Sequence, residues 1–175
     1  MANSDLVTDL KLAIIKELVK DEAIFNAIDS SEITDIKQAH KLVYKHIFPY
    51  HRIPQTITET STLMTIQVHI REGRSRNTLF ITPTLEFWIY SHQDHMEVKN
   101  IPKVSDTRND YISRLLDKKF NGRSSLGRNN DLKNDISTYG ELNLVLNDEG
   151  STQQGFLYRH MIFETRDLNK SLCEL

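Results

Sequence analysis

This sequence has little of several residue types that mark special architectures. Of its 175 residues, one is cysteine (Cys173), six are glycine and four are proline. A single cysteine excludes a disulfide within the chain and a zinc site built from several cysteines. So few glycines and prolines leave no segment with the composition of a flexible linker. We therefore expect residues 1–175 to form a single domain.

Excess charge of one sign and long apolar runs are also absent. The formal net charge is −2, whereas a general nucleic-acid binder usually has a clear basic excess. No run approaches the ~18 apolar residues of a membrane-spanning helix. Residues 1–5 lack the charged start and apolar run of a signal peptide. With 38% hydrophobic and 26% charged residues, the composition is that of a folded domain, which we expect to be assembled in the cytoplasm.

The first part of the chain has helical periodicity. Apolar residues recur every four positions at Leu6, Leu10, Ile14 and Leu18. This spacing predicts an amphipathic helix over residues 5–19, with Ser4 as its N-cap. A second, short helix is expected over 21–28, and residues 32–47 fit either a helix or an ordered loop. Residues 5–47 thus form a predicted helical N-terminal part.

Two prolines mark the end of this helical part. Pro49 and Pro54 each remove a backbone donor, fix φ and push the preceding residue toward an extended conformation. Residues 48–59 are therefore predicted to be a stiff hinge that leads the chain from helix into sheet.

Residues 60–165 have the patterns of a β-rich part with one helix. Strands are expected over 60–71 and 78–91, joined by a polar connection at 72–77 as a long antiparallel hairpin, with Pro83 bending or bulging the second strand. A helix is expected over 106–120, ended by Gly122 in a left-handed turn. After it we expect a polar loop (123–130), strand pieces near 131–138 and 141–146, a turn at 148–151, a last strand over 155–165 and a polar tail over 166–175. The predicted fold is α+β: a mainly antiparallel sheet with a long hairpin, an N-terminal helix and one central helix packed on the sheet.

The strand over 78–91 is apolar on both faces. Leu85, Phe87 and Ile89 alternate with Trp88 and Tyr90. Such a strand is either sandwiched within its own chain or exposed for a partner. Both alternatives remain open from the sequence.

The sequence His92-Gln93-Asp94-His95 is the best metal-like cluster in the chain. Two imidazoles and a carboxylate are ligands that zinc accepts. No third and fourth ligand follows at a known spacing, and a solvated loop explains the same residues. The chain also lacks a Gly-x-Ser-x-Gly nucleophile elbow and a phosphate-binding Gly-x-x-x-x-Gly-Lys loop.

Several arginines lie in the predicted polar connections. Arg71, Arg74 and Arg76 form a basic hairpin tip, and Arg123 and Arg128 flank the loop after the central helix. Such residues bind phosphate or acidic side chains of a neighbour, or simply keep a loop soluble.

Taken in order, these parts resemble the neck and tail-completion proteins of tailed bacteriophages, especially of phages that infect Gram-positive bacteria. The resemblance rests on the N-terminal helix, the hinge Ile47-Phe48-Pro49-Tyr50-His51-Arg52-Ile53-Pro54, the strand with Phe87-Trp88-Ile89-Tyr90, the helix 110–120 with Asn121-Gly122, and the closing Phe163–Asn169. It implies a small α/β unit, a sheet flanked by helices, that forms a ring, commonly a hexamer, at the head–tail junction. Tail terminators and head–tail joining proteins belong to this group.

The resemblance carries further expectations. It implies a virion structural protein that is not an enzyme, has no cofactor or metal, and contacts the tail tube and the head-side connector while DNA passes through the ring. Contacts between subunits and along the ring axis are expected from the 72–77 tip, the 123–130 loop, and Trp88 and Tyr90. Two alternatives remain: a small metal-dependent enzyme using His92, Asp94 and His95, or a host-side binding module.

Overall fold

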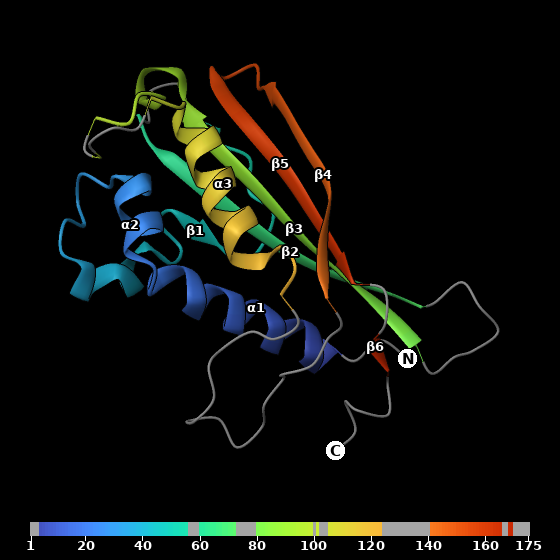
Figure 1. Ribbon diagram of the computed structural model, residues 1–175. Coiled ribbons are helices and arrows are strands. Elements are labelled where there is room, and N and C mark those ends of the chain that lie inside the picture. Colours follow the sequence, from blue (N-terminus) through green and yellow to red (C-terminus); the bar gives the residue numbers. More distant parts are fainter. Residues whose placement is uncertain are drawn as a thin grey trace.

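The computed structural model describes residues 4–55, 60–72, 80–99, 101, 105–123, 141–165 and 168–169. Within these ranges the fold is α+β, as predicted (Figure 1). The α-helices are α1 (Ser4–Val19), α2 (Glu22–Ile28) and α3 (Arg108–Phe120), and the 3₁₀ helices are η1 (Ile36–Leu42) and η2 (Gln93–His95). The strands are β1 (Ile47–Phe48), β2 (Thr62–Glu72), β3 (Phe80–His92), β4 (Leu142–Ser151), β5 (Phe156–Thr165) and β6 (Leu168–Asn169).

All the described strands belong to one sheet, in the order β1-β2-β3-β5-β4, and β6 pairs with the start of β3. Only the pairing of β1 with β2 is parallel. The β2–β3 register runs from Thr62 opposite Ser91 to Glu72 opposite Ile81. This confirms the predicted long hairpin, whose connecting residues 73–79 lie outside the described part.

The bulge expected at Pro83 is absent. Pro83 lies opposite Ile70, and the register between β2 and β3 is unbroken on both sides of it. The pairing of β3 with β5 begins only at Thr84, whereas β6 pairs with Phe80 and Ile81. Pro83 therefore falls between these two pairings, where no described strand needs the donor that proline lacks.

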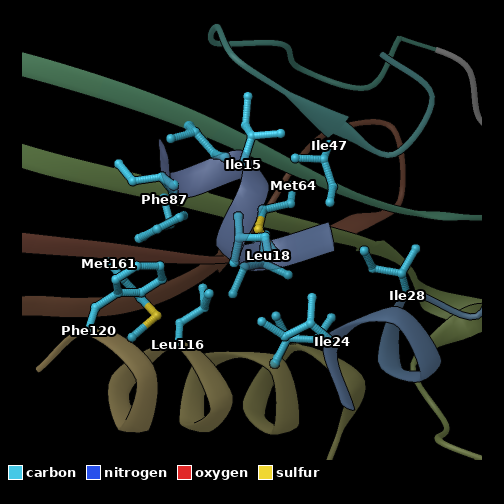
Figure 2. Packing of buried hydrophobic residues seen from close by; sticks show 14 of the residues in the cluster. Ile15, Leu18, Ile24, Ile28, Ile47, Met64, Phe87, Leu116, Phe120 and Met161 are labelled. Atoms are coloured by element: carbon cyan, nitrogen blue, oxygen red, sulfur yellow. The ribbon is translucent and has the colours of Figure 1, made fainter. Parts of the chain in front are cut away.

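The three α-helices lie on one face of the sheet (Figure 1). Their buried side chains meet those of Met64, Phe87 and Met161 in the main hydrophobic core. Figure 2 shows this layer, with side chains from α1, α2 and α3 converging on β1, β2, β3 and β5. The Phe87 ring lies at the centre, stacked on Phe120 of α3 at 5.3 Å and edge-on to Phe163 of β5 at 6.0 Å. The predicted N-terminal and central helices on the sheet are thus confirmed.

Local signals explain most helix ends. The Asp21 carboxylate accepts hydrogen bonds from the N–H groups of Ala23 and Ile24 and caps α2. Asp29 ends α2 in the left-handed conformation with φ of 52°. Gly122 has φ of +74° just after α3, as predicted. Ser4 is the first described residue and already belongs to α1, and the predicted N-cap role of its side chain lies outside what the structure describes.

The turn predicted at 148–151 is wrong. These residues continue β4, and the chain turns at Thr152–Gly155, where Gly155 has φ of +76°. The turn was predicted because Gly150 follows the polar residues Asp148 and Glu149, a composition typical of turns. Its role is instead to leave room for the Tyr158 ring, because a Cβ at position 150 would lie 2.5 Å from Tyr158 Oη. The strand predicted near 131–138 and the loop residues 124–130 lie outside the described residues.

The remaining predictions concern the segment that leads into the sheet and the C-terminal tail. Residues 32–47 contain the 3₁₀ helix η1. Ile47 and Phe48 already belong to the sheet as β1, so the sheet begins at the last residue of the predicted helical part, one residue before the predicted hinge. In the tail, Leu168 and Asn169 pair with β3 as β6. None of the described helices has the length and apolar character needed to cross a membrane.

Candidate functional site

The face of the sheet turned away from the helices is the candidate site, and we call it the outer face. The register places Trp88 opposite Thr65 and His160, and Tyr90 opposite Leu63 and Tyr158, so these side chains share one face. Leu85, Phe87 and Ile89 point the other way into the helix-covered core. The predicted two-sided character of β3 is therefore confirmed. Among the described residues no helix packs on the outer face.

Flat aromatic rings cover the centre of the outer face. The Trp88 indole stacks on the His160 imidazole, with ring centroids 3.8 Å apart and planes 12° apart. Tyr158 and Tyr90 lie within 5.2 and 6.0 Å of the same indole. Neighbouring strands supply these rings, because residues directly opposite each other on paired strands bring their side chains together.

Glu86 holds this ring layer in place. Its Oε1 accepts hydrogen bonds from Trp88 Nε1 at 2.8 Å and His160 Nε2 at 2.6 Å, and its Oε2 lies 3.1 Å from His69 Nε2. A carboxylate only accepts hydrogen bonds, so the imidazole nitrogens facing it carry protons. Burial raises the pKa of Glu86, but the hydrogen bonds from Trp88 and His160 outweigh burial and leave this pKa below 4.5. The charged form is therefore the one that orders the layer at neutral pH.

Tyr90 is the buried member of the same layer, at 2% exposed. Its side chain belongs to a small second cluster with Phe48, Leu63 and Phe156. Burial, together with the nearby Tyr158 and Glu86, raises the pKa of Tyr90 to about 12. Its hydroxyl therefore stays neutral throughout the physiological range.

The hinge closes one side of the outer face. In β1, Ile47 points into the main core while Phe48 enters the second cluster, so the strand contributes to both faces. After it, the His51 ring lies edge-on to Trp88 at 5.5 Å, and the Arg52 guanidinium sits 4.4 Å from the centre of the Phe48 ring. The predicted stiff hinge is thus packed against the sheet through its side chains.

The predicted metal-like loop does not bring its histidines together. His92 is 4% exposed, and its Nδ1 accepts a hydrogen bond from the Asp94 N–H at 3.3 Å. His95 points elsewhere, with Nδ1 3.0 Å from Thr62 Oγ1 and Nε2 3.7 Å from the Asp29 carboxylate. Burial and then the Arg108 charge lower the pKa of His95. In the described part of the chain, no group of three histidine, cysteine or acidic residues is arranged to hold a metal ion.

Most of the arginines predicted to make contacts lie outside the described residues. Arg74, Arg76 and Arg128 lie outside the described residues, and Arg71 is placed only as part of the β2 backbone. Arg123 is described, and its guanidinium pairs with Glu17 of α1 at 3.4 Å. This contact is internal and ties the end of α3 to α1.

Sequence reasoning found Trp88 and Tyr90 but missed the residues that complete the site. Glu86 could have been found, because it stands two positions before Trp88 and so shares its face. Tyr158 and His160 are also two positions apart, so they share one face of β5. Their own segment of the sequence does not indicate that they lie beside Trp88. That placement depends on the pairing of β3 with β5, which joins residues more than sixty positions apart.

Comparison with known proteins identifies a family for this chain. A family model described as YomW matches residues 17–165. No curated protein and no solved structure matches the chain significantly. Because the family model covers most of the sequence, the chain belongs to the YomW family.

Proposed function

We propose that this protein is a structural subunit of a tailed-phage virion that forms a ring at the head–tail junction. The observation that carries the proposal is the layer of aromatic side chains on the outer face. This layer is partly exposed and is held in place by hydrogen bonds to Glu86. Aromatic side chains that are already ordered lose little conformational freedom when a partner covers them. The outer face is therefore suited to a protein contact.

The resemblance of the sequence to neck and tail-completion proteins supports the same proposal. The fold agrees with what that resemblance implies, a small unit in which helices flank a sheet. The hinge residues 47–54, the strand segment around Trp88 and the α3 helix, which carry much of the resemblance, lie in the described part of the chain. On this proposal the partners are further copies of the chain, commonly six in a ring, together with the tail tube and the head-side connector.

No observation favours the alternative of a metal-dependent enzyme. The imidazoles of His92 and His95 have separate partners, and Asp94 interacts only with the first of them. The proposed role needs no catalytic group.

Genetic inactivation in a phage that carries this gene tests the proposal. We expect DNA-filled heads and separate or irregular tails in electron micrographs, and recovery of complete virions when the wild-type gene is supplied in trans. Ile162 of β5 stands opposite Glu86 and so also lies on the outer face. Two outer-face variants, Trp88→Ser and Ile162→Arg, should fail to restore virions while retaining the wild-type circular dichroism spectrum. Leu12→Arg, on the exposed surface of α1, is the matched control and should restore them.

Normal virion yield without the gene would overturn the proposal. So would finding that purified virions contain no copy of the chain by mass spectrometry.

A further inference from the structure

The two edges of the sheet carry different and complementary groups. In the strand order, β1 and β4 are the outermost strands of the described sheet. A contact between two different surfaces on identical copies is heterologous, and repeating it generates a closed ring when the rotation closes. An edge-to-edge contact is therefore the simplest way for this sheet to build the ring proposed above.

The β1 edge, residues 44–54, presents exposed apolar groups and a positive charge. Tyr44, Tyr50 and Ile53 are 66%, 47% and 48% exposed. Arg52 is also exposed, and its guanidinium contacts only the Phe48 ring among the interactions of the described residues. Pro49 and Pro54 restrict the backbone that carries these side chains. The segment is thus a stiff surface with little conformational entropy to lose.

The β4 edge, residues 145–151, presents an apolar residue and negative charge. Val145 is 49% exposed and lies in the bulge between Leu144 and Leu146, without a partner in the register. Asp148 is exposed and stands opposite His160, so it lies on the outer-face side of the edge. Glu149 points to the other side, where it pairs with Arg159 at 3.1 Å. Asp148 therefore remains available to a cation from outside the chain.

Only part of the β4 edge is used within the chain. The Leu144 N–H donates to Asn121 Oδ1, and Leu142 exchanges hydrogen bonds with residues 122 and 123. From Val145 onward, no described strand pairs with the outer side of β4. Charged side chains on an edge strand discourage continued sheet pairing. The available contact is therefore one between side chains.

We propose that the β1 edge of one copy binds the β4 edge of the next copy, with Arg52 facing Asp148 and Ile53 facing Val145. The inference rests on the proposed ring function and names the surface that would build it. Both Arg52 and Asp148 lie toward the outer face, so the contact would continue the aromatic layer from one copy to the next.

Cysteine cross-linking tests the contact at the residues that define it. The chain is purified with Cys173→Ser, Ile53→Cys and Val145→Cys, and is mildly oxidised. A non-reducing gel should show a ladder of multiples of the chain. The matched control replaces Val145→Cys with Leu12→Cys, which is 50% exposed on α1 and should give little product above a dimer. An equal ladder in the control, or no ladder in the test protein, would overturn the contact.

Exchanging the two charges provides a second test of the proposed contact between Arg52 and Asp148. In the cross-linking background, Arg52→Glu or Asp148→Lys alone should lower the ladder yield about threefold to tenfold, because attraction becomes repulsion. The double variant Arg52→Glu with Asp148→Lys should restore it. Failure of restoration would contradict the pairing of these two residues.

The two proposals fail separately. If native mass spectrometry shows oligomers of the wild-type chain but the Ile53→Cys and Val145→Cys pair gives no ladder, the ring stands and this contact is wrong. If virions lack the chain, the proposed function fails whatever the gel shows.

Discussion

Glu86 is the single residue on which the order of the outer face depends most. Its carboxylate takes hydrogen bonds from Trp88 and His160 and lies beside His69, yet its own side chain is only 16% exposed. A charge in such a position is tolerated because donors surround it. Loss of the charge therefore affects three side chains together.

Glu86→Gln should destabilise the domain by about 1–2 kcal/mol, because hydrogen bonds to a charged group are stronger than those to an amide. The pKa of Glu86 is lowered in the folded state, so its contribution is present above pH 4.5 and is lost as the pH falls through the folded-state value. Urea unfolding of both proteins from pH 7 to pH 3 measures this. The difference between them should shrink below pH 4.5.

Glu164→Gln is the control for this measurement. Glu164 stands opposite Thr84 on the same face, and none of the interactions found among the described residues joins its carboxylate to a donor. It should cost less than about 0.5 kcal/mol. A loss equal to that of Glu86→Gln would show that any charge on this face has the same effect.

Among the elements, β4 shows how one glycine lets a strand pass close to a large side chain of its neighbour. Gly150 allows the Tyr158 ring to lie across the strand. Gly150→Ala should destabilise the domain by about 1–3 kcal/mol, because the added methyl group would overlap the ring. Thermal unfolding measures the change.

A second substitution separates overlap from backbone effects. In a Tyr158→Leu background the same Gly150→Ala change should be nearly neutral, because the ring that it meets is gone. An equal loss in both backgrounds would rule out the ring as the cause.

The elements also show where sequence prediction succeeds and where it stops. The α1, β2, β3, α3 and β5 patterns are local, since each is written in the periodicity of one segment, and all five were predicted near their observed bounds. The parallel pairing of β1, the β6 contact and the Glu86 cluster were not predicted. Each depends on which segments meet in space, and the residue pattern of one segment does not encode its partner.

At the scale of the whole molecule, the Arg108 side chain links the helical N-terminal part to α3 and to the segment after β3 by hydrogen bonds. Its side chain is 1% exposed and donates to the carbonyls of Ala27, His95 and Glu97 and to the Asp29 carboxylate. Burial lowers the pKa of Arg108 and the Asp29 charge counteracts this, so the group remains a cation. One side chain thus joins the end of α2, the loop after β3 and the start of α3.

Arg108→Met should destabilise the domain by about 3 kcal/mol, because one buried carbonyl, two partly buried carbonyls and a carboxylate lose their donor. Denaturant unfolding followed by circular dichroism measures the loss. Arg114→Met is the matched control. Arg114 is on the same helix but 63% exposed; it pairs with Asp106 and its guanidinium lies 5.7 Å from the centre of the Tyr111 ring, so its loss should cost below about 1 kcal/mol. Equal effects of the two changes would contradict the role given to Arg108.

The position of β3 between β2 and β5 has a consequence during synthesis. When β3 leaves the ribosome, its partner β2 has already emerged, but β5 follows more than sixty residues later. At about 5–20 residues per second, the nascent hairpin waits for several seconds with the β5 side of β3, including Trp88 and Tyr90, unpaired. Until then the rings of Trp88 and Tyr90 lack the Tyr158 and His160 neighbours that they contact in the finished domain.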